Sequence, residues 1–292
     1  MFECLNADQA IPTDQVSVGI NLPPIAEPKK GVHVRKRVLV ALRAYGDHEL
    51  ADEYERCNPR DLCRLHHCDR CRGRWFYSAL NRVNETKALF YGSQPYHDIE
   101  AKRHMRHVTG LVALVRLSVR AIKAAIKECK KGFQSFSKKF KNVPVLGFYE
   151  IELINVPMMV QAGACPEKRR TLEEMLGRDL SEVNEVMALV HWHVLMFFRG
   201  GNGDEEKVQK WLRKHYPHRR QVRIDPLRWE QDLSDSLKKL AGYPLKNRHR
   251  YNLSFDTHGY ENGNYIRPKE LSFLVKLSRE VPISEMKIRL RC

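Results

Sequence analysis

The clearest pattern in this chain is a set of apolar side chains at helical intervals between residues 122 and 140. Apolar residues recur there every three or four positions, which draws one stripe along a helix and predicts that the stripe packs on a core. Lysines fill most of the other positions, and we interpret them as a solvated face, with contact to DNA as the alternative. The stripe consists of Ile122, Ile126, Cys129, Phe133, Phe136 and Phe140.

Three apolar segments around this helix predict strands. Residues 108–117 precede the helix. Val145–Ile154 follow Pro144, which ends the helix because the residue before a proline avoids helical backbone angles. The third segment, Leu189–Phe198, comes after a polar insertion at residues 155–188, and its aromatic and apolar content is typical of a buried strand.

Weaker patterns complete the organisation of the chain. Residues 1–34 carry four prolines and no clear period, which predicts a flexible arm. Residues 172–176 predict a short helix, and residues 221–224 a short strand. Residues 92–97 predict a loop. Helices are also expected at residues 35–56, 75–90, 205–215, 229–240 and 270–279.

Two histidines interrupt the third strand. His191 and His193 are two residues apart, so a strand would present both imidazoles on one face. Neutral imidazole is the commonest metal ligand, and burying two of them without a partner is costly. The pair therefore indicates a metal site, although two ligands do not define one and a satisfied pair of core histidines is the alternative.

Two carboxylates interrupt the strand at residues 145–154 in the same way. Glu150 and Glu152 would share a face of that strand beside apolar neighbours. Carboxylates in such surroundings are usually paired or bound to metal. A glutamate here could complete the metal site, with an ion pair to Arg or Lys as the alternative.

Four of the eight cysteines lie close together in one turn-rich segment. Thiolates at such spacing can enclose a zinc ion, and Cys68-x-x-Cys71 is the usual half-site. His66 and His67 are spare ligands, and a group of free thiols is the alternative. The four are Cys57, Cys63, Cys68 and Cys71.

The charge of the chain favours a polyanionic partner. Lys and Arg number 51 against 35 Asp and Glu, which gives a net charge of +16. Each phosphate that such a protein neutralises releases counterions, so nucleic acid is the expected partner. Arginines crowd around the cysteines, and those that we assign to phosphate contacts are Arg64, Arg70, Arg72 and Arg74.

Nothing in the sequence suggests a membrane protein or a secreted one. No stretch of about 18 apolar residues is present to span a bilayer. The start of the chain, Met1-Phe2-Glu3-Cys4, lacks the basic and then apolar segments of a secretory signal. We therefore expect a cytoplasmic protein without contact to a membrane, in which the cysteines stay reduced.

The order of these features resembles that of the HUH endonucleases, specifically the rolling-circle replication initiators of small plasmids and phages. A cysteine cluster, a strand, a helix rich in Lys and Phe, a strand with glutamates and a His-x-His strand follow one another, and a Tyr-x-x-Lys comes later. The stretch from Lys123 through residues 147–152 to residues 191–195 carries most of the similarity, which covers residues 57–250.

This resemblance implies an α+β fold. A central antiparallel sheet of the ferredoxin or RRM-like kind would be flanked by helices, with a zinc-knuckle segment ahead of it. The implied organisation is a flexible arm at 1–34, a helical and zinc-knuckle region at 35–91, an HUH endonuclease domain at 92–268, and a C-terminal helix and tail at 269–292.

The resemblance also implies a chemistry. Glu152 matches the family position of the acidic ligand, so that His191, His193 and Glu152 would hold Mg²⁺ or Mn²⁺, while Zn²⁺ would be structural. The ion at the histidines would polarise the scissile phosphate, and a tyrosine would attack it to leave a 5′-phosphotyrosine and a free 3′-hydroxyl. Glu150 and Glu185 are the second and third choices for the acid.

We choose Tyr243 as the nucleophile. Lys246 follows three residues later, as in the family's Tyr-x-x-Lys, and would lie on the same side of a helical turn. Pro244 departs from that helical pattern, and Tyr251 is the fallback. The implied activity is sequence-specific nicking and joining of DNA that is either single-stranded or folded as a hairpin origin. The chain has no Gly-x-x-x-x-Gly-Lys loop, so a helicase, like the polymerase, would come from the host.

Other functions stay open. A transposase with the same chemistry would differ only in its DNA and its genetic surroundings. A zinc-knuckle regulator could bind nucleic acid without cleaving it, and a metal-dependent hydrolase could also use His-x-His. Three aromatic residues could stack on unpaired bases, although burial in the core is the simpler interpretation. They are Trp211, Tyr216 and Trp229.

Overall fold

A five-stranded antiparallel sheet forms the centre of the fold, with strand order β4-β1-β3-β2-β5. The computed structural model describes residues 29–58, 60–65, 67–163, 166–200, 203–242, 250–251 and 265–290. β3 is the central strand, and every one of its residues is buried. The strands are β1 (Met105–Arg116), β2 (Val145–Asn155), β3 (Val186–Phe197), β4 (Val222–Pro226) and β5 (Lys287–Leu290).

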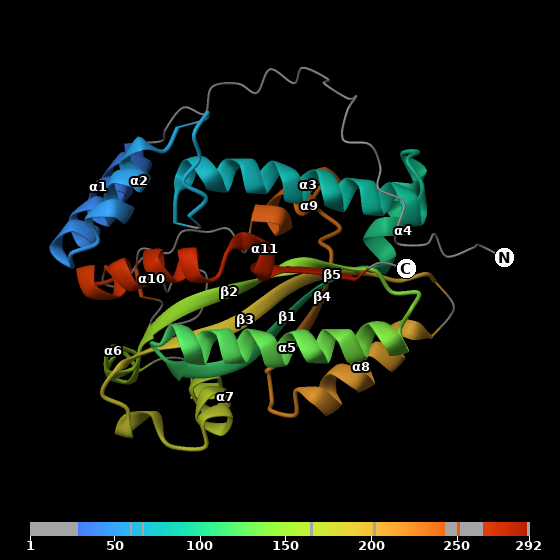
Figure 1. Ribbon diagram of the computed structural model, residues 1–292. Coiled ribbons are helices and arrows are strands. Elements are labelled where there is room, and N and C mark those ends of the chain that lie inside the picture. Colours follow the sequence, from blue (N-terminus) through green and yellow to red (C-terminus); the bar gives the residue numbers. More distant parts are fainter. Residues whose placement is uncertain are drawn as a thin grey trace.

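Helices cover both faces of this sheet, with α5 on one side and α3 on the other (Figure 1). This arrangement confirms the α+β class with a central antiparallel sheet flanked by helices. The helices are α1 (Lys29–Ala44), α2 (His48–Arg56), α3 (Asp69–Tyr91), α4 (Tyr96–His104), α5 (Val119–Lys139), α6 (Val156–Gln161), α7 (Pro166–Leu176), α8 (Asp204–His215), α9 (Leu233–Gly242), α10 (Pro268–Glu280) and α11 (Ile283–Met286), with a 3₁₀ helix, η1, at Leu180–Glu182.

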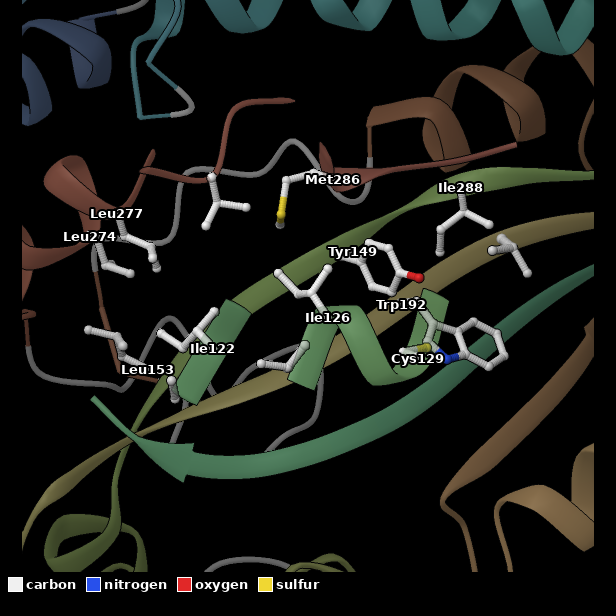
Figure 2. Packing of buried hydrophobic residues seen from close by; sticks show 14 of the residues in the cluster. Ile122, Ile126, Cys129, Tyr149, Leu153, Trp192, Leu274, Leu277, Met286 and Ile288 are labelled. Carbon is white, nitrogen blue, oxygen red and sulfur yellow. The ribbon is translucent and has the colours of Figure 1, made fainter. Parts of the chain in front are cut away.

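Helix α5 packs the predicted apolar stripe against one face of the sheet. The Phe133 ring meets Trp192 of β3 edge to face, with ring centroids 5.3 Å apart. Figure 2 shows Ile122 and Ile126 of α5 in the same buried cluster as Tyr149 of β2. The core-facing stripe is thus confirmed, and the lysines of α5 lie on the side of the sheet away from residues 191 and 193.

The opposite face of the sheet carries two separate apolar clusters. Leu195 and Phe197 of β3 pack with residues of α3, α4 and α9 at one end of this face. Met187 and Leu189 of β3 pack with residues of α6, α7 and η1 at the other end. The stretch of β3 between the two clusters contains His191 and His193, so the fold leaves the polar residues in the middle of this face.

The ends of several elements differ from those expected. Helix α1 begins at Lys29, inside the stretch expected to be a flexible arm, and α4 begins at Tyr96, inside the expected loop. β5 comes from the stretch expected to be a tail, yet it pairs with β2 at the edge of the sheet. A strand of four residues shows too few alternations to be recognised from sequence. The described helices include none that is long and apolar enough to cross a lipid bilayer.

Gly147 allows β2 to approach β3 closely beside His193. A methyl group at position 147 would lie 2.0 Å from the backbone oxygen of His193. We therefore expect Gly147→Ala to lower the free energy of unfolding by about 1–3 kcal/mol, measured by urea denaturation. Gly132→Ala on α5 is the matched control, because a methyl group there meets nothing within 4 Å. Unchanged stability of Gly147→Ala would contradict the close approach of the two strands.

Candidate functional site

His191 and His193 lie side by side on the central strand, with ring centroids 4.9 Å apart. The neighbouring strands place polar groups opposite them. Glu150 of β2 pairs with His191, and Thr109 of β1 pairs with His193. Trp192, between the two histidines, contacts α5 on the other face. The alternation of the strand therefore separates the imidazole pair from the main core, as the sequence predicts.

Glu150 brings its carboxylate to both imidazoles. Glu150 Oε2 lies 3.0 Å from His193 Nε2 and 3.5 Å from His191 Nε2. One ligand atom from each of the three side chains lies within 4.8 Å of the others. Imidazole suits Zn²⁺ and Fe²⁺, and carboxylate suits Mg²⁺ and Mn²⁺, so this mixed set could hold a divalent metal ion.

Glu152 lies beside this group but outside it. Its Oε2 is 3.8 Å from His191 Nε2, and its partner across the strands is Leu189 rather than a histidine. Glu150, our second choice from the sequence, is therefore the acid that the structure joins to both imidazoles. Glu185, the third choice, is half-exposed and lies 3.6 Å from Arg116.

Strand β1 supports the histidines from the other side. Thr109 Oγ1 lies 3.1 Å from Nδ1 of His193. A hydrogen bond at Nδ1 sets the orientation of the ring and leaves Nε2 toward Glu150. His107 stacks on His193 with centroids 5.6 Å apart. Burial, together with nearby His193 and Arg223, lowers the pKa of His107 to about 3, so this imidazole is neutral near pH 7.

Four polar side chains in the middle of this face are almost fully buried. Glu150, Glu152, His191 and His193 are each 4–6% exposed. Charged and polar groups are rarely buried in this way unless they are paired or bound to metal. Their burial beside one another is therefore the expected environment of a metal site.

The cysteine cluster forms a second group that could hold a metal ion. Four thiolates at about 2.3 Å from a tetrahedral zinc would be roughly 3.8 Å apart. The Sγ atom of Cys57 lies 3.4 Å from Sγ of Cys68 and 3.6 Å from Sγ of Cys71. The Sγ atoms of Cys63 and Cys71 are 3.7 Å apart. All four side chains are buried. The spacing therefore fits a tetrahedral four-cysteine site.

Backbone amides support the sulfur atoms. The N–H of Cys63 donates to Cys57 Sγ at 3.4 Å, and that of Arg64 donates to Cys71 Sγ at 3.2 Å. Hydrogen bonds from the side chains of Cys63 and Cys71 lower the pKa of Cys68. Donors of this kind stabilise thiolates and are typical of the surroundings of metal ligands. Of the spare histidines, His67 stands outside the four-cysteine group and His66 lies outside the described residues.

The four arginines that we assigned to phosphate contacts have different environments. The Arg70 guanidinium donates to the backbone oxygen of Cys57, so it holds the cysteine segment together. Arg72 is half-buried, whereas Arg64 and Arg74 are exposed. Only Arg64 and Arg74 of the four line a pocket beside the cysteine cluster.

Two of the three residues chosen for the nucleophilic step are not described by the structure. Tyr243 and Lys246 lie in the undescribed stretch that follows α9 in the sequence. Tyr251 is described, and it is buried, with its hydroxyl accepting a hydrogen bond from the N–H of Arg267 at 3.2 Å. Burial raises the pKa of Tyr251. Its hydroxyl is thus engaged at the start of α10 rather than within the group of Glu150 and the two histidines.

The aromatic residues considered for base stacking divide into two classes. Trp211 is buried and contacts Phe136 of α5, and Tyr216 accepts a hydrogen bond from Trp192 Nε1 at 3.2 Å. These two residues belong to the core. Trp229 is 54% exposed and is available at the surface.

No protein-family model, curated protein or solved structure matches the chain. The geometry of the site therefore carries the functional argument. His107 and Thr109 were not identified from the sequence as part of this site. They alternate along β1 and so share one face of it, which could have indicated their role. The strand expected at residues 108–117, however, began after His107.

Replacing Glu150 tests which carboxylate belongs to the histidine site. Glu150→Gln keeps the shape of the side chain but removes its charge, so we expect the dissociation constant for Mn²⁺ to rise about tenfold or more. Glu152→Gln changes a neighbouring carboxylate on the same face and should have a smaller effect. Isothermal titration calorimetry measures both constants. A larger loss of Mn²⁺ affinity in Glu152→Gln would identify Glu152 as the acidic metal ligand, as the sequence suggested.

Replacing Cys68 tests the cysteine site. Metal binding at such sites contributes directly to folding, so Cys68→Ser should lose the bound ion and melt at a lower temperature. Elemental analysis and thermal denaturation measure the two effects. Cys129→Ala is the control, because this buried cysteine lies in the core beside Tyr216 and should keep the metal content of the wild type. Full metal content in Cys68→Ser would contradict the site.

Proposed function

We propose that this protein nicks and rejoins single-stranded DNA to initiate rolling-circle replication, as HUH endonucleases do. The observation that carries the proposal is the convergence of Glu150, His191 and His193 on one face of the central strands. A five-stranded antiparallel sheet with a Lys- and Phe-rich helix on its other face supports the same assignment. The net charge of +16 suits a nucleic-acid substrate.

The donor set of the site fits Mg²⁺ or Mn²⁺, and its two imidazoles favour Mn²⁺. A divalent ion supplies a positive charge that polarises the scissile phosphate. His191 and His193 offer their Nε2 atoms, and the Thr109 hydroxyl at Nδ1 of His193 keeps that ring oriented. Glu150 would contribute one negative charge that offsets part of the charge of the ion, and burial keeps bulk water from weakening these interactions.

Tyr243 acts as the nucleophile in this proposal, on the basis of its Tyr-x-x-Lys context with Lys246. The phenol loses its proton as its oxygen forms a bond to phosphorus, and the bond from phosphorus to the 3′ oxygen breaks. The leaving oxygen takes up a proton and becomes a free 3′-hydroxyl, while the 5′ phosphate stays on the tyrosine. Because the new phosphodiester conserves the energy of the old one, a 3′-hydroxyl can later reverse the step and rejoin the strand.

The remaining parts of the proposal concern partners. The cysteine cluster binds a structural Zn²⁺, and its flanking arginines contact the DNA backbone. A helicase of the host separates the strands and a polymerase of the host extends the free 3′ end, and the protein acts in the cytoplasm. A transposase would use the same residues on different DNA.

A covalent adduct with DNA tests the proposed function. The full-length protein is incubated with Mn²⁺ and a pool of random-sequence single-stranded oligonucleotides, labelled at either end. A 5′-phosphotyrosine retains the downstream fragment, so we expect a denaturant-resistant adduct that carries the 3′ label but not the 5′ label. Tyr243→Phe should abolish the adduct, and Tyr251→Phe should retain it.

His193→Ala provides the matched control for the metal site. We expect it to abolish the adduct while DNA binding, measured by gel retardation, persists. An adduct that survives in Tyr243→Phe and disappears in Tyr251→Phe would move the nucleophile to Tyr251. Binding of DNA without any adduct, in Mg²⁺ and in Mn²⁺, would contradict the nicking function and favour a regulator that binds nucleic acid through the cysteine segment.

A further inference from the structure

A pocket of ≈ 550 Å³ lies between the cysteine segment, the first turns of α3 and the start of α11. This volume is within the range of small-ligand pockets, about 300–1,000 Å³. Figure 1 shows α11 between α3 and the edge strand β5. The pocket is separate from the site of Glu150 and the two histidines, because none of its described lining residues belongs to the sheet.

The lining is strongly basic. Arg60, Arg64 and Arg74 line the pocket, and Asp61 is the one acidic residue among the described lining residues. All three arginines are exposed, and within the described part of the chain none of them forms an ion pair. Three guanidinium groups against one carboxylate make the pocket attractive to an anion. Guanidinium groups also match the geometry of a phosphate through paired N–H donors.

One wall of the pocket is apolar. Trp75 of α3 lines it together with Leu62 and Ile283. Trp75 is half-buried against the core, so the structure fixes its position. An indole beside guanidinium groups is the combination that binds single-stranded nucleic acid, because a base can stack on the ring while the arginines hold the phosphate. An anion without a flat apolar part would leave this wall unused.

The cysteine cluster holds the basic residues in place. Arg64 has a φ of 59°, a left-handed conformation that is uncommon outside glycine. Its backbone N–H donates to Cys71 Sγ, so the cluster maintains this conformation. Arg74 lies one helical turn after Cys71 on α3. The positions of these two arginines therefore depend on the cysteine cluster.

We propose that this pocket binds a nucleotide of single-stranded DNA, with its phosphate at Arg60, Arg64 and Arg74 and its base against Trp75. The inference rests on the proposed function for the choice of DNA as the ligand, and it adds a substrate contact remote from the nicking centre.

Helix α3 links the pocket to the histidine site, because its later residue Val83 packs in the cluster beside the histidine face. Val83 lies about 12 Å along the helix from Trp75.

Binding of a fluorescein-labelled oligothymidylate to the full-length protein tests the pocket. Fluorescence anisotropy is measured without added Mg²⁺ or Mn²⁺, so that the result does not depend on cleavage. The double variant Arg64→Ala/Arg74→Ala should bind about tenfold or more weakly. The slope of log affinity against log salt should become shallower by about 1.4, since each phosphate contact on a single strand contributes about 0.7.

The matched control removes two positive charges from α5. Arg120→Ala/Lys127→Ala alters two exposed residues of α5 that are not among the described lining residues of the pocket, so the net charge changes equally. We expect this variant to keep the affinity of the wild type. An equal loss in both double variants, with metal content and melting temperature unchanged, would overturn the proposal and assign the binding to net charge alone.

A second comparison tests the base. An oligonucleotide with abasic sites should bind the wild type more weakly than oligothymidylate does, and Trp75→Leu should remove that difference. A polyglutamate peptide that displaces oligothymidylate at equal charge concentration would overturn the assignment in favour of an acidic protein segment. Adduct formation at Tyr243 is measured separately, so the pocket can fail while the nicking function holds, and the reverse.

Discussion

The register of β2 and β1 against β3 is the constraint on which the candidate site depends. It places Glu150 opposite His191 and Thr109 opposite His193, so one carboxylate reaches both imidazoles and one hydroxyl orients the second ring. A shift by one residue would send the carboxylate to the face that α5 covers. Gly147 helps to fix this register, because only a residue without a side chain lets β2 lie so close to His193.

The helices enclose this group of polar side chains in apolar surroundings. Apolar clusters at both ends of the histidine face isolate the polar residues between them, while α5 closes the other face. A low-dielectric setting strengthens the attraction between a carboxylate and a cation. Helix α3 belongs to both functional regions, since its first turn carries Cys71 and its later turns pack beside the site. The cysteine cluster is thereby connected to the sheet through one rigid element.

Local periodicity explains which features could be predicted from the sequence. The stripe on α5, the shared face of His191 and His193, and the clustering of the four cysteines all follow from spacings within one segment. The choice between Glu150 and Glu152 could not follow in this way, because both occupy the same face of β2. It depends on pairing between strands that are about forty residues apart, which a single sequence does not encode locally. The short strand β5 was not predicted for a different reason, because four residues show too little alternation of apolar and polar side chains to be recognised.

The central claim is that Glu150, His191 and His193 together bind one divalent ion. Crystals of the protein grown with Mn²⁺ would test it most directly, through the anomalous scattering of manganese. The account predicts one strong peak within about 2.0–2.3 Å of both Nε2 atoms and of a Glu150 carboxylate oxygen, distances usual for such ligands. A peak coordinated by other residues, or no peak at this face of β3, would contradict it.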